Sequence, residues 1–133
     1  EMQRAQGQNE EALATYDAVM SKTNAAYEKE YEEGGEFQNW ALAYGLHENY
    51  YLSALSEAKI YGELGQHDKA LEKINIFLQK YPREAGVIAD RGDIKLKLGD
   101  TAGAEADYRE ALKYVPDYAP ALEALEKMGV GGK

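Results

Sequence analysis

The chain has 133 residues, a length that supports one domain with a substantial core. Its formal net charge is -9 at pH 7, and this excess of carboxylates disfavours nucleic acids and anionic lipid surfaces as partners. The absence of cysteine excludes thiol catalysis, disulfides and thiolate metal sites, and the apolar runs are too short for insertion into a membrane.

Two long helices are the first predicted elements. Apolar side chains recur every three or four residues over 9–33 and over 36–64, and Gly34-Gly35 separates the two stretches. We expect these helices to form an extended antiparallel hairpin, part of which projects beyond the rest of the protein. A break near Asn49-Tyr50, which would give three shorter helices, remains an alternative.

An internal repeat of 34 residues follows the first long helix. Gly65 and Gly99 are 34 residues apart, and so are Pro82 and Pro116. The two segments that align without a gap are residues 51–84 and 85–118. Each segment predicts a helical hairpin, because the glycine ends a first helix and the proline ends a second one. Small residues recur where the paired helices must approach closely. They are Ala58, Ala70, Gly92 and Ala104.

The repeat resembles the tetratricopeptide repeat family, whose 34-residue helix-turn-helix unit has small residues on both helices, an aromatic residue on the second and a closing proline. This resemblance implies an all-α fold in which helical hairpins stack into a superhelix. Its matching residues in 85–118 are Gly92, Gly99, Asp100, Ala104, Tyr108, Ala111 and Pro116, and those in 51–84 are Ala58, Tyr61, Gly65, Ala70 and Pro82. In 51–84, Ile74 replaces the usual aromatic residue and Phe77 the usual alanine.

The two ends of the chain show partial versions of this pattern. Gly7, Ala12, Tyr16 and Val19 resemble the second helix of a repeat, so Gly7 is expected to end a preceding helical turn. Residues 119–128 predict a closing helix, because an array of repeats needs a cap over its last apolar face. We therefore expect residues 1–133 to form a single tetratricopeptide-like domain.

No candidate active site emerges from the sequence. The histidines are His47 and His67, and neither has a second histidine or cysteine at the helical spacing of a metal site. We interpret His47 as a packed side chain and His67 as a surface one. Because the phosphate-binding glycine motif is also missing, we predict no catalytic residue, no metal site and no cofactor, and hence no enzyme.

The family resemblance also implies where a partner would bind. In a stack of helical hairpins, the first helices line a concave groove. The positions that carry over are Leu52, Leu55, Ser56, Lys59 and Gly62, then Gly86, Ala89, Asp90, Asp93 and Leu96, and finally Pro120, Glu123 and Lys127 in the closing helix. The lining is apolar near Leu52 and Leu55. It is acidic near Asp90 and Asp93, which favours a neutral or basic peptide segment. One subgroup of the family holds the C-terminal carboxylate of chaperones with lysine, arginine and asparagine residues, and that set is missing here.

We interpret the protein as a non-enzymatic module that binds a segment of a partner protein in this groove. An alternative is a scaffolding domain that forms a homodimer through the aromatic residues of the long hairpin. These residues include Tyr27, Tyr31, Phe37, Trp40 and Tyr44. A third interpretation is an accessory repeat region of a longer enzyme. A soluble protein is expected, with a cytoplasmic location favoured over a periplasmic or secreted one.

Overall fold

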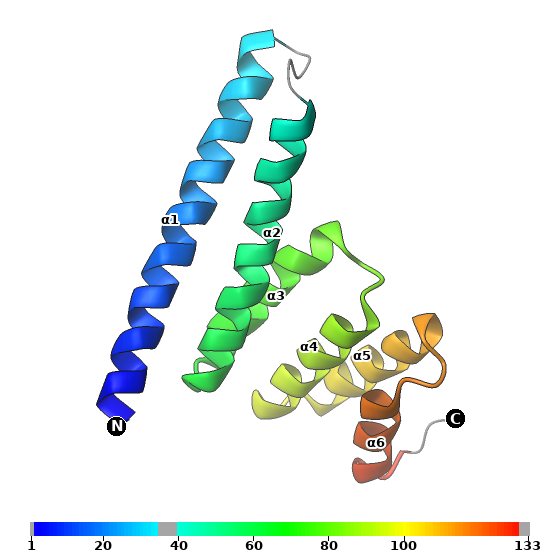
Figure 1. Ribbon diagram of the computed structural model, residues 1–133. Coiled ribbons are helices and arrows are strands. Elements are labelled where there is room, and N and C mark those ends of the chain that lie inside the picture. The colour runs from blue at the N-terminus through cyan, green and yellow to red at the C-terminus, as the bar shows by residue number, and fades with distance from the viewer. Residues whose placement is uncertain (1, 35–39, 131–133) are drawn as a thin grey trace.

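The computed structural model describes the backbone of residues 2–34 and 40–130, and the side chains of residues 7–26, 28, 29 and 48–130. These residues form six helices and no strand, which confirms the all-α fold class. The helices are α1 (Met2–Gly34), α2 (Trp40–Glu63), α3 (His67–Lys80), α4 (Ala85–Lys97), α5 (Thr101–Tyr114) and α6 (Ala119–Lys127). Figure 1 shows α1 and α2 as a long antiparallel pair, with α3 against the later turns of α2 and the α4–α5 hairpin beside it.

The helices α2, α4 and α6 end in the same way. Gly65, Gly99 and Gly129 follow their last turns with φ angles of +75°, +84° and +78°. In each case the next residue donates its backbone N–H to a carbonyl five residues earlier, at 2.9, 2.8 and 3.2 Å. This left-handed ending favours glycine, because a side chain there would meet the backbone. The predicted ends of the first two of these helices are confirmed.

The start of α1 differs from the prediction. This helix begins at Met2, so Gly7 lies inside it and does not end a preceding turn. A glycine within a helix costs only about 1 kcal/mol relative to alanine, and a helix of 33 residues tolerates that penalty. The alternative break near Asn49-Tyr50 is also wrong, since α2 continues through both residues. Its predicted start at residue 36 lies outside the described residues.

Small residues allow the paired helices to approach closely. Ala58, Ala70 and Ala104 are at most 3% exposed. Gly92 faces the fully buried ring of Tyr108, and a Cβ atom at Gly92 would lie 2.9 Å from Cε1 of that ring. Any larger residue at 92 would therefore push α4 away from α5. The main buried cluster extends from this contact into α3 and α6.

The last helix covers the stack on one side and faces solvent on the other. Ala121 and Leu125 of α6 are fully buried, and both belong to the main cluster. Glu126 follows Gly92 by one 34-residue period, but its side chain is exposed. A charged residue at the position where α4 has glycine gives α6 a hydrophilic outer face. This arrangement is that of the capping helix expected from the sequence.

Candidate functional site

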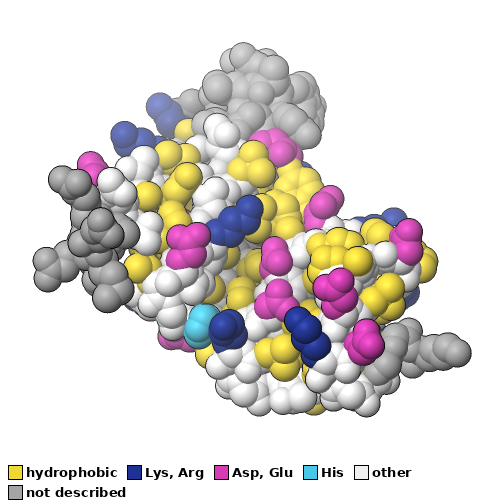
Figure 2. All heavy atoms as spheres, turned by 60° about the horizontal axis from the view of Figure 1, so that its bottom comes forward, with side chains coloured by type: hydrophobic (Ala, Val, Ile, Leu, Met, Phe, Trp, Pro, Cys, Tyr) yellow, Lys and Arg dark blue, Asp and Glu magenta, His cyan; other side chains and the backbone are white. Residues whose placement is uncertain are grey.

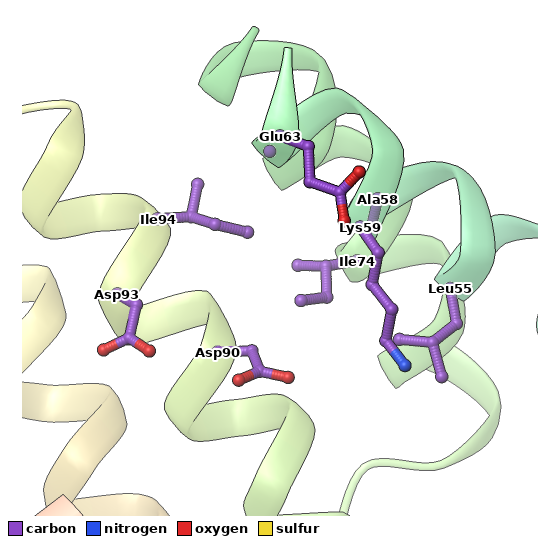
Figure 3. Close-up of a pocket in the computed structure, with 9 residues that line it drawn as sticks. Leu55, Ala58, Lys59, Glu63, Ile74, Asp90, Asp93 and Ile94 are labelled. Carbon is purple, nitrogen blue, oxygen red and sulfur yellow. The ribbon is translucent and has the colours of Figure 1, made fainter. Parts of the chain in front are cut away.

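A groove opens between the first helices of the two hairpins. It is a hollow of about 470 Å³ with walls from α2 and α4 and a floor from α3. Its lining residues are Leu55, Ala58, Lys59, Gly62 and Glu63 of α2, Ile74 of α3, and Asp90, Asp93 and Ile94 of α4. Figure 3 shows Ile94 and Ile74 directed into the hollow, with Lys59 on the opposite wall from Asp90. The space-filling view shows apolar surface interrupted by acidic and basic side chains at this end of the molecule (Figure 2).

Five of the groove positions expected from the sequence line this hollow. They are Leu55, Lys59, Gly62, Asp90 and Asp93. The other expected positions lie outside it, and Ala89 among them is buried. The rest are Leu52, Ser56, Gly86, Leu96, Pro120, Glu123 and Lys127, of which Leu52 is 49% exposed.

Ala89 does not offer a contact surface as expected. It is only 3% exposed and belongs to the main buried cluster, because α4 packs against both α3 and α5. The Tyr118 side chain also limits access of a partner to Gly86, since a Cβ atom there would lie 3.3 Å from the hydroxyl oxygen of Tyr118. The part of α4 available to a partner is therefore the turn that carries Asp90, Asp93 and Ile94.

Sequence reasoning missed four lining residues, Ala58, Glu63, Ile74 and Ile94. The most informative is Ile74, because it comes from a second helix, whereas the expected positions came from first helices only. Its counterpart one period later is Tyr108, just as Ala58 corresponds to Gly92. Tyr108 fills the space beside Gly92, but the shorter Ile74 has no hydroxyl and leaves the hollow beside it open. The absence of the usual aromatic residue at 74 was the sequence signal for this hollow.

The charge of the groove is predominantly negative. Glu63, Asp90 and Asp93 contribute three carboxylates against the single ammonium of Lys59. Although the Asp90 residue is exposed overall, its carboxyl points from α4 into the hollow. Reduced solvation there raises its pKa, the nearby charge of Asp93 raises it further, and the positive charge of Lys59 opposes this rise.

A hydrogen bond links the groove wall to the core. The Tyr108 hydroxyl donates to Oδ1 of Asp93. Burial, followed by this bond to a carboxylate, raises the pKa of the Tyr108 hydroxyl, which therefore keeps its proton and remains a donor. One of the two aspartates on α4 is thus held in place by a side chain from α5.

The other side of α4 is fixed by a charge network. Arg91 donates to both oxygens of Asp107, at 3.0 and 2.8 Å, and also to Asn75 at 3.1 Å. The Lys95 ammonium lies 2.9 Å from Asp107, whose side chain is 4% exposed. Because these residues belong to α3, α4 and α5, the network fixes the position of α4 relative to both neighbours.

The described part of the chain does not supply a metal-binding cluster. Over the side chains of 7–26, 28, 29 and 48–130, no group of three or more acidic or histidine residues is placed to hold an ion. His67 begins α3 and is half-buried. His47 lies outside the described side chains. Among the helices of residues 2–34 and 40–130, none has both the length and the apolar character needed to cross a bilayer.

Comparison with known families identifies the repeat. Residues 52–83, which span the second half of α2 and all of α3, match the family model described as tetratricopeptide repeat. This match confirms the resemblance seen in the sequence, and residues 52–83 form a tetratricopeptide repeat. Among curated proteins, none matches the chain. Repeats of this family generally bind protein partners and are typically without catalytic activity.

Proposed function

We propose that the protein is a non-enzymatic interaction module that binds a segment of a partner protein in the groove between α2 and α4. The observation that carries this proposal is the hollow itself. Leu55, Ile74 and Ile94 provide an apolar floor and walls, and charged side chains stand around them. An apolar centre with a polar rim is the usual composition of a site that anchors a peptide side chain.

The rigidity of α4 supports the same function. The network around Asp107 fixes one face of this helix, and the contact between Gly92 and Tyr108 fixes another. A groove wall held in this way is already ordered before a partner binds. Binding then requires less loss of conformational entropy, which increases the affinity for a given area of contact.

Filling the hollow tests this function. The double variant Ala58→Gly with Ile74→Tyr copies the arrangement of Gly92 and Tyr108 into the first repeat. We expect it to fold and to lose binding of peptides that wild type selects from a random dodecapeptide library. Ala106→Tyr adds the same side chain at an exposed position of α5 and serves as the control. Equal peptide binding by wild type and a folded double variant would contradict the proposal.

Self-association through the long hairpin gains no support from the described residues. In α1, Leu13, Met20 and Thr23 are buried, whereas the exposed residues between 7 and 26 are polar, glycine or alanine. A dimer contact on this stretch would bury little apolar area, although stable dimers depend on such burial. The aromatic residues Tyr27, Tyr31, Phe37, Trp40 and Tyr44 lie outside the described side chains. We therefore retain groove binding as the proposed function.

A further inference from the structure

Tyr108 connects the core of the protein to the groove. Tyr108 belongs to α5, and its ring is fully buried. The ring packs against α4 at Gly92, where no side chain intervenes. Its hydroxyl reaches Oδ1 of Asp93 on the groove wall. A fixed donor on one oxygen sets the orientation of the whole carboxylate. Because a carboxylate has about four acceptor sites, most of its accepting capacity remains for a partner.

Asp90 lies three residues before Asp93, so the two carboxylates share one face of α4. Like charges at this spacing repel each other, and a cation placed between them would remove that repulsion. Lys59 of the opposite wall supplies only one positive charge to a groove with three carboxylates. The groove therefore has unbalanced negative charge directly beside the apolar side chains of Ile74 and Ile94.

We propose that the groove selects a segment in which a lysine or arginine stands next to an apolar residue, and that Tyr108 is the positioning residue for this selection. The cation lies between Asp90 and Asp93, and the apolar side chain contacts Leu55 and Ile94, which are only partly buried. Arginine fits best, because its planar guanidinium donates to two carboxylate oxygens at once. This inference rests on the proposed groove function and adds to it the chemistry of the partner.

The first experiment compares Tyr108→Phe with wild type. The probes are a basic peptide selected by wild type from the dodecapeptide library and the same peptide with norleucine in place of its cation. We expect Tyr108→Phe to lower the affinity for the basic peptide by about threefold to tenfold, measured by fluorescence anisotropy, as loss of one hydrogen bond implies. The affinity for the norleucine peptide should change by less than about twofold, because this peptide has no cation to bind the Asp93 carboxylate. Equal weakening of both peptides would give Tyr108 a purely structural role and overturn the inference.

Charge variants give a second, independent readout. Asp90→Asn should weaken the basic peptide and reduce the effect of salt on its binding, since one attractive charge is lost. Lys59→Met should have the opposite effect and raise the affinity for the same peptide, because a competing cation is removed from the groove. Opposite shifts in these two variants are not expected from a general loss of stability. Unchanged affinity in both would overturn the inference.

The outcomes separate this inference from the function on which it depends. If wild type selects peptides that the groove-filling variant Ala58→Gly with Ile74→Tyr does not bind, but those peptides are not enriched in basic residues, groove binding stands and the inference is wrong. If the selected peptides bind the filled variant equally well, the proposed function is wrong. If wild type selects no peptide, the groove is not a peptide site and both proposals are wrong.

Discussion

The Glu57 carboxylate lies 3.1 Å from the Lys73 ammonium, inside the contact between α2 and α3. The Glu57 side chain is completely buried, and the Lys73 ammonium is the positive charge that faces it. Lys73 also lies 3.8 Å from Asp17 of α1. These charged groups therefore join the first three helices, and the complete burial of a carboxyl group makes their junction sensitive to protonation.

The first prediction concerns the pH dependence of stability. Burial raises the pKa of Glu57 from 4.5 to about 7, Lys73 opposes this rise, and Asp17 adds to it. In the folded protein Glu57 thus keeps its proton at pH values where the unfolded chain has lost it. Its contribution to stability is complete below about pH 4.5 and decreases as pH rises to about 7.

Replacement of Glu57 by glutamine removes this titration. Relative to wild type, Glu57→Gln should gain up to about 3 kcal/mol in free energy of unfolding between pH 4.5 and pH 8. Urea denaturation across this range measures the difference. Asp68→Asn, at an exposed position of α3, is the control and should show no such change. A constant difference between Glu57→Gln and wild type at every pH would contradict the prediction.

The second prediction concerns the charge network behind α4. Asp107→Ala should destabilise the protein by about 2 to 4 kcal/mol, because Arg91 and Lys95 lose a buried carboxylate that both contact. The ion pair between Arg109 and Glu105, at 2.9 Å on the surface of α5, provides a matched comparison. Glu105→Ala should cost no more than about 0.5 kcal/mol. Thermal melts of both variants test this contrast, and similar losses would show that burial of the pair does not matter.

The third prediction concerns the contact between α4 and α5. Gly92→Ala should destabilise by about 1 to 3 kcal/mol, since the new methyl group would lie 2.9 Å from the Tyr108 ring. Gly62→Ala is the control, because a Cβ atom there has no neighbour within 4 Å. It should stabilise α2 by up to about 1 kcal/mol through helix propensity. Chemical denaturation should therefore shift in opposite directions for the two variants.

The fourth prediction separates the two aspartates of the groove. Asp93→Ala should cost about 1 to 2 kcal/mol, because the buried Tyr108 hydroxyl loses its acceptor. Asp90→Ala changes an exposed residue and should remain within about 0.5 kcal/mol of wild type. Differential scanning calorimetry of the two variants provides the measurement. If neither substitution changes the stability, the hydrogen bond between Tyr108 and Asp93 contributes nothing to it.

Much of the fold could be predicted from the sequence, because the ends of the helices depend on local backbone conformation. Gly65 and Gly99 adopt the positive φ angles that end a helix, and their 34-residue spacing is visible without a structure. Gly7 shows where this reasoning fails. A single glycine without a following breaker ends no helix, because the penalty of about 1 kcal/mol is small beside the interactions of a long α1.

The groove was harder to predict, because it depends on contacts between repeats. Asp90 and Asp93 were expected at its wall, but the side of α4 that Ala89 faces could not be known from its place in the repeat. The floor depends on the length of Ile74 relative to its counterpart Tyr108. The burial of Glu57 had no sequence signal, since a glutamate on α2 fits equally well on a solvated face.

The relationship between Ile74 and Tyr108 also bears on how binding sites evolve in helical repeats. The two hairpins have the same turns and the same spacing. In the α4–α5 hairpin Tyr108 fills the space beside the first helix, whereas a hollow lies beside Ile74 of the α2–α3 hairpin. Exchange of Ala58 and Ile74 for the glycine and tyrosine of the second hairpin is expected to close this hollow, and the reverse exchange to open one. Arrays of this kind can therefore acquire new specificities repeat by repeat while the stacking that holds them together stays unchanged.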